Sequence, residues 1–175
     1  MAGSGRPGWA VLLALGPIMV AAYAGAGRVA IEAGVRAQIG DPATWTGLVH
    51  PSGLTTLGVD TWRLTWWTAL VVGLVSVLYT VFGVLLRRGS RGRALILVMS
   101  GVLIVPYALG FGVALFNPPV MMGNFYDSPE FLSGLPGWQP YTAWLLLAGG
   151  LCQAVGLVRA ATRRRRDAAA VSGPD

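Results

Sequence analysis

Lysine is absent from this chain, and cysteine and histidine occur only once each among its 175 residues. The single cysteine, Cys152, excludes an intrachain disulfide bond and a cysteine-based metal site. Charged residues make up only 11% of the sequence, whereas a soluble domain contains about 25%. This shortage of charge predicts a membrane protein.

Charge is also missing from four long apolar stretches, which contain no acidic, basic or histidine side chain. They cover residues 9–27, 64–86, 94–116 and 141–158. A bilayer core about 30 Å thick is crossed by roughly 20 apolar residues in a helix, and each stretch meets or approaches that length. We therefore expect an all-α integral membrane protein, an antiparallel four-helix transmembrane bundle with two outer loops that form a small cap. This single membrane domain is expected over residues 1–166, with a disordered cytoplasmic tail over 167–175.

Arginine supplies all of the positive charge and lies mostly on one side of these spans. The runs between the second and third spans and after the fourth are Arg87, Arg88, Arg91, Arg93, Arg163, Arg164, Arg165 and Arg166. Cytoplasmic flanks retain positive charge, so we expect both termini in the cytoplasm and a multi-pass protein of the plasma membrane, the bacterial inner membrane. Because these arginines adjoin the spans, we expect anionic lipid headgroups as their partner and no nucleic acid.

The first span has a competing interpretation. Arg6, the apolar run that follows it and the small-residue pattern Ala22-Tyr23-Ala24 also resemble a cleavable signal peptide. The apolar run is longer than the core of most signal peptides. We therefore expect a retained span.

Proline and polar residues predict where the helices bend and where they begin. Pro17 and Pro106 lie inside the first and third spans, where each should bend its helix. The apolar spacing over residues 31–39 predicts that the first helix continues beyond the membrane. Asp60 or Thr61 is the expected cap of the second span.

The outer side of the predicted bundle is rich in aromatic residues. The candidate surface for a partner or a lipid consists of Trp45, Trp62, Trp66, Trp67, Phe125, Tyr126, Phe131 and Trp138. Three interpretations remain open: an interfacial aromatic belt, a surface for a partner protein, or a pocket for a lipid-like molecule. Belts normally form at both membrane faces, but only Trp9 lies at the inner one. This asymmetry favours a role beyond a belt.

Charged residues and paired cysteines, on which several classes of membrane transporter and oxidoreductase depend, are missing from the spans. Pumps, proton-coupled carriers and voltage sensors keep charged residues within the membrane, and this chain has none there. Small four-span exporters rely on a buried carboxylate and four-span thiol oxidoreductases on paired cysteines, so both classes are disfavoured. We interpret Gln153, in the fourth span, as a polar link between helices rather than a ligand contact. His50 and the outer acidic residues show no catalytic or metal-binding spacing.

These observations predict a non-enzymatic function without a cofactor. We expect an accessory or structural subunit of a larger membrane assembly, with membrane lipid and a membrane protein as partners. The alternative is a binder, carrier or enzyme for a lipophilic small molecule, a lipid or a quinone, at the outer leaflet. That alternative places the ligand between helices bent at Pro17 and Pro106, with Trp66 and Tyr107 as the residues to mutate.

Overall fold

The computed structural model describes residues 8–40, 45–88 and 92–171, which form helices and no strand. The elements are α1 (Gly8–Ile39), α2 (Thr56–Arg88), α3 (Arg93–Val102), α4 (Ile104–Leu115), α5 (Pro118–Phe125), α6 (Pro129–Ser133), the 3-10 helix η1 (Gln139–Thr142) and α7 (Ala143–Val171). Four helical segments are long and apolar enough to cross a membrane. They are Gly8–Ile39, Thr56–Arg88, Ala94–Leu115 and Gln139–Thr162. The all-helical fold and its four candidate spans are as the sequence predicts.

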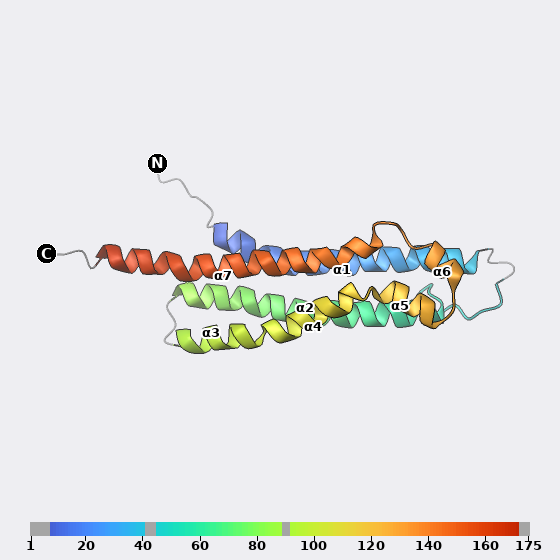
Figure 1. The fold of residues 1–175 in the computed structure, drawn as a ribbon, viewed down its shortest axis with the longest axis horizontal. Helices are drawn as coiled ribbons and strands as arrows, with labels where there is room; N and C mark the ends of the chain where they lie inside the picture. The colour runs from blue at the N-terminus through green and yellow to red at the C-terminus, as the bar shows by residue number, and fades with distance from the viewer. Residues whose placement is uncertain (1–7, 41–44, 89–91, 172–175) are drawn as a thin grey trace.

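The long helices lie side by side along the longest axis of the molecule, and successive ones run in opposite directions (Figure 1). α1 packs extensively against both α7 and α2, whereas the α3–α4 pair lies against α2 and contacts α7 less. α2 ends and α3 begins at one end of the molecule, and α5 and α6 lie at the other (Figure 1). We call these the arginine end, after Arg87 and Arg88 at the end of α2, and the cap end.

α1 is one continuous helix through Pro17 and extends to Ile39, as the apolar spacing predicts. It stops at Gly40, whose positive φ of 58° is the left-handed conformation that often terminates a helix. The backbone N–H of Gly40 donates to the carbonyl of Arg36 at 3.1 Å.

The third span is divided at Leu103, since α3 ends at Val102 and α4 begins at Ile104. The Leu103 N–H still donates to the carbonyl of Met99 at 3.0 Å, so the two helices remain continuous along the backbone. Pro106 has no N–H to donate to the carbonyl of Val102, and its ring clashes with that carbonyl in a regular helix. The interruption at Leu103 therefore falls where the proline disturbs the backbone. α4 itself ends before Asn117, which has a positive φ of 56°.

The predicted cap of α2 is wrong, because the helix begins at Thr56, before Asp60 and Thr61. Thr55 is the cap, since its Oγ1 accepts a hydrogen bond from the backbone N–H of Gly58 at 3.3 Å. Thr61 lies inside the helix and donates to the carbonyl of Leu57 at 2.8 Å.

α7 continues well beyond the predicted end of the fourth span at residue 158. Residues 167–171 form its last helical turn, where the sequence predicts a disordered tail, and residues 172–175 lie outside the described part of the chain.

Two clusters of buried apolar residues hold the helices together. The first joins α1, α2, α4 and α7 and consists of Val20, Tyr23, Ala69, Val72, Ala114, Ala143 and Leu146. The second lies at the cap end and consists of Ile31, Val35, Leu54, Leu57 and Phe131. Packing therefore extends beyond the predicted spans into the cap.

Candidate functional site: a groove between α3–α4 and α7

The predicted aromatic surface at the cap end separates into exposed and buried members. Five of its eight side chains are exposed: Trp66, Trp67, Phe125, Tyr126 and Trp138. Trp45 and Trp62 are half-buried. Phe131 is fully buried, so its assignment to a contact surface is wrong.

Phe131 is buried because the short helix α6 directs it against α1. A Cβ atom added at Gly34 of α1 would lie 2.7 Å from Cε2 of Phe131, so only glycine leaves room for the ring. Pro129 and Glu130 begin α6 as the first-turn residues of a short helix. Phe131 therefore packs inside the cap.

Three charged side chains at the cap end, those of Arg28, Glu32 and Asp60, have partners within the protein. The Arg28 guanidinium lies 5.3 Å from the Trp62 ring centroid, and its Nε donates to Glu32 Oε1 at 2.6 Å. The Tyr126 hydroxyl donates to Asp60 Oδ2 at 2.6 Å. This hydrogen bond to a carboxylate raises the pKa of Tyr126, because ionisation of the phenol would remove it. These contacts give the charged residues a structural role within the cap.

At the arginine end, Arg87 and Arg88 are exposed, and the Arg87 guanidinium lies 4.9 Å from the Trp9 ring centroid. Arg91 lies outside the described residues. Arg93 and the run Arg163–Arg166 are described as parts of α3 and α7 by their backbone only.

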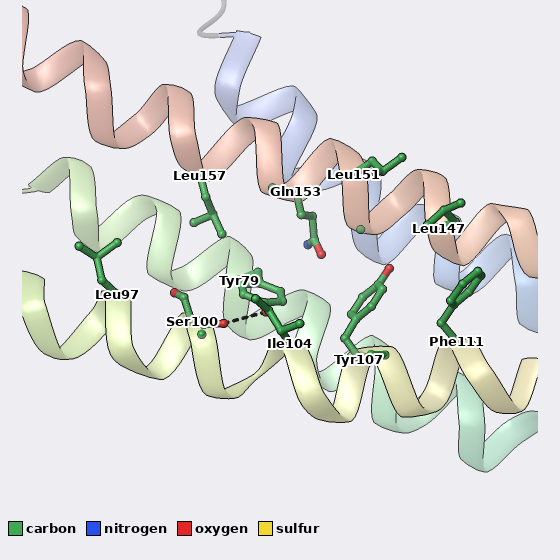
Figure 2. A pocket seen from close by; sticks show the side chains of 14 residues that line it. Tyr79, Leu97, Ser100, Ile104, Tyr107, Phe111, Leu147, Leu151, Gln153 and Leu157 are labelled. Atoms are coloured by element: carbon green, nitrogen blue, oxygen red, sulfur yellow. Dashed lines mark hydrogen bonds between the residues drawn. The ribbon is translucent and has the colours of Figure 1, made fainter.

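A groove of about 510 Å³ lies between α3–α4 and α7, with part of α2 behind it (Figure 2). Its volume is within the roughly 300–1,000 Å³ typical of small-molecule sites. It extends from Leu97 to Phe111 along α3 and α4, and from Leu157 to Leu147 along α7. The groove thus occupies the arginine-end half and the middle of the candidate spans, away from the aromatic cap.

Two tyrosines cross between the helices that form the groove. The Tyr79 hydroxyl on α2 donates to the carbonyl of Ser100 on α3 at 2.9 Å, beside the interruption at Leu103 (Figure 2). The Tyr107 hydroxyl on α4 donates to the carbonyl of Leu146 on α7 at 2.6 Å. The first bond joins α2 to α3 and the second joins α4 to α7, so both link helices that surround the groove.

Gln153 forms part of the groove wall and is only 1% exposed. Its Nε2 donates to the carbonyl of Ser76 on α2 at 2.7 Å and to the carbonyl of Leu13 on α1 at 3.3 Å. Leu13 lies four residues before Pro17, so its carbonyl lacks the helical N–H partner that any other residue would supply. Thr80 also donates to this carbonyl, at 3.2 Å. The proline in α1 and the glutamine in α7 are therefore structurally coupled.

Gly16 makes this arrangement possible. A Cβ atom at Gly16 would lie 2.2 Å from Cδ of Gln153, so the amide occupies the space that a side chain on α1 would take. The interpretation of Gln153 as a polar link between helices agrees with these contacts. It accounts for the amide nitrogen, Nε2, but not for the amide oxygen, Oε1.

The other half of the amide, Gln153 Oε1, is buried and has no hydrogen-bond partner in the described structure. Figure 2 shows the amide reaching from α7 toward Tyr79 and Ile104, in the space that the groove residues surround. Ser100 Oγ, on the opposite wall, is likewise buried without a partner in that part of the chain. Buried polar atoms are usually satisfied, so this acceptor is an exception among the described residues.

Sequence reasoning identified Gln153 and Tyr107 but not their common location. The signal for Gln153 was its polarity within an apolar span. Tyr79 and Ser100 gave no comparable signal, because hydroxyl groups are common in membrane helices.

No protein-family model, curated protein or solved structure matches this chain. In the described residues, no three His, Cys, Asp or Glu side chains lie close enough together to hold a metal ion.

Proposed function

We propose that this protein binds a lipophilic small molecule, a lipid or a quinone, in the groove between α3–α4 and α7. The observation that carries this proposal is the unpartnered Gln153 Oε1 in the wall of a hollow of about 510 Å³. The walls are otherwise almost entirely apolar, with aliphatic side chains along both α3–α4 and α7. Such a site combines an apolar surface for a chain or ring with one directed polar contact.

The proposed arrangement in the membrane is an antiparallel four-helix transmembrane bundle with the arginine end in the cytoplasm. Exposed Arg87 and Arg88 at that end support it, because positive charge is retained on the cytoplasmic side. In this orientation the groove lies in the cytoplasmic half and the middle of the membrane. The proposed ligand site therefore differs from the outer-leaflet site expected from sequence.

A matched pair of glycine substitutions tests the groove. Apart from neighbouring residues of its own helix, nothing described lies within 4 Å of a Cβ atom built on Gly101 or on Gly112, so both positions have room for a larger side chain. Gly101 lines the groove and Gly112 does not. We expect Gly101→Phe to weaken binding of a radiolabelled lipophilic probe by at least tenfold, and Gly112→Phe to leave binding unchanged. Equal binding by both variants and the unaltered protein would refute the proposal.

The second candidate function is that of an accessory subunit in a larger membrane assembly. It is favoured by four large aromatic side chains that are exposed rather than packed inside the chain: Trp66, Trp67, Phe125 and Trp138. Purification from native membranes in mild detergent tests this function. A stable complex that is lost on Trp66→Ala/Trp67→Ala supports it, whereas a monomer without partners contradicts it.

A further inference from the structure

We infer that the groove selects an uncharged lipophilic alcohol or phenol, whose hydroxyl group donates a hydrogen bond to Gln153 Oε1. The inference rests on the proposed function, because it names the chemical class of molecule that the groove takes. Three features of the groove lead to it: the lack of charge in its walls, the fixed orientation of one amide, and the hydrogen-bonding state of its hydroxyl groups.

The walls disfavour a charged headgroup. The 14 described residues that line the groove include no Asp, Glu, Lys, Arg or His. A phosphate or carboxylate placed among them would lose its hydration and find no opposite charge, which is costly in an apolar setting. The polar group of the ligand is therefore neutral.

The amide of Gln153 determines the direction of the hydrogen bond. Its Nε2 faces two carbonyl acceptors, those of Ser76 and Leu13, so this end of the amide must be the NH₂ group. The remaining atom, Oε1, is a carbonyl oxygen that only accepts hydrogen bonds. A quinone, an ester or an ether offers further acceptors and leaves Oε1 unsatisfied. A hydroxyl group supplies the missing donor.

The other polar atoms of the groove strengthen this selection. The hydroxyl protons of Tyr79 and Tyr107 are already donated to backbone carbonyls, so these groups offer a ligand only lone pairs. Ser100 Oγ lacks a partner among the described residues and can donate or accept. The groove thus has more acceptors than donors, which favours a ligand that brings its own proton.

The test compares two probes that differ only at the hydroxyl group, radiolabelled oleyl alcohol and oleyl methyl ether. Each probe is incubated with the full chain purified in a maltoside detergent. The dissociation constants are then measured by scintillation proximity. We expect the alcohol to bind about fivefold to tenfold more tightly, the effect of one neutral hydrogen bond to a buried acceptor.

Two substitutions of the same residue identify the acceptor. Gln153→Met removes both polar atoms of the amide and keeps a side chain of similar length. The ratio of the two dissociation constants should then fall to about one. Gln153→Glu is protonated in this apolar position, so its hydroxyl can donate to the Ser76 carbonyl while its carbonyl oxygen remains an acceptor. This variant should keep the preference. Because the ratio of the two probes is measured within each variant, a loss of stability does not obscure it.

The outcomes separate the two proposals. If alcohol and ether bind equally well to the unaltered protein and Gly101→Phe weakens both, the groove is a binding site without selectivity for hydroxyl groups. If the preference persists in Gln153→Met, Gln153 is not the acceptor; either result overturns this inference alone. If neither probe binds, the proposed function fails as well.

Discussion

The two halves of α1 each accommodate a large side chain from elsewhere in the chain at a glycine, but they do so with opposite chemistry. Toward the cap end, Gly34 receives the ring of Phe131 from α6. Toward the arginine end, Gly16 receives the amide of Gln153 from α7. In both places a Cβ atom on α1 would overlap the incoming side chain, so each glycine is required for packing.

The difference lies in what each side chain leaves unsatisfied. Phe131 is fully enclosed by apolar residues and has no further contact to make. Gln153 is almost as deeply buried, yet its Oε1 lacks a partner in the described structure. A buried apolar ring contributes to stability, whereas a half-satisfied amide lowers it unless a further partner donates a hydrogen bond. The cap half of α1 thus supports packing alone, and the other half also supports the groove of the proposed function.

The largest expected effect is on the cap. Phe131→Ala removes a fully buried ring and should lower the free energy of unfolding by about 3–5 kcal/mol, measured by denaturant titration in detergent. Phe125→Ala is the matched control, because Phe125 is 82% exposed and its loss should change stability by less than about 0.5 kcal/mol. A comparable loss for the control would show that Phe125 is covered in the native protein and would weaken the contrast between the two rings.

A smaller effect is expected at the other end of α1. Gly16→Ala displaces Gln153 and leaves the carbonyls of Leu13 and Ser76 with fewer donors, at a cost of about 1–3 kcal/mol. Gly25→Ala makes the same substitution in the same helix, where no described atom lies within 4 Å of the new Cβ. It should be neutral or stabilise the protein by up to about 1 kcal/mol, because alanine has the higher helix propensity.

Thermal unfolding of both variants in the same detergent measures this difference. Equal stability of Gly16→Ala and Gly25→Ala would mean that the amide of Gln153 is not held against α1, and the comparison with Phe131 would no longer stand.

How much of this could be predicted from sequence depends on the range of the interactions. The spans and the end of α1 near Gly40 follow from hydropathy and from neighbouring residues, which are local. The burial of Phe131 could not be predicted, because Phe125 is a similar ring in the same loop and only contact with Gly34 distinguishes them.

The groove was also beyond sequence analysis, for the same reason. It depends on how the interrupted α3–α4 pair lies against α2 and α7, and on hydrogen bonds such as the one from Gln153 to Ser76, 77 residues away. A proline four residues after Leu13 and a glutamine in another span are both visible in the sequence. Their connection requires three helices to be placed in space.

The smallest expected effect concerns the hydrogen bond between Tyr126 and Asp60 at the cap end. Tyr126 donates to Asp60, and this bond raises the pKa of the phenol above its ordinary value of 10.0. Because the folded-state pKa is the higher one, the stabilisation is present below the ordinary pKa and is lost as the pH rises through the raised value. Absorbance titration of the tyrosines should show one ionisation that moves to lower pH in Asp60→Asn, while Asp127→Asn leaves it in place. An ionisation unaffected by Asp60→Asn would mean that α5 is not held to α2 through this pair, and the cap would then be less rigid than the groove.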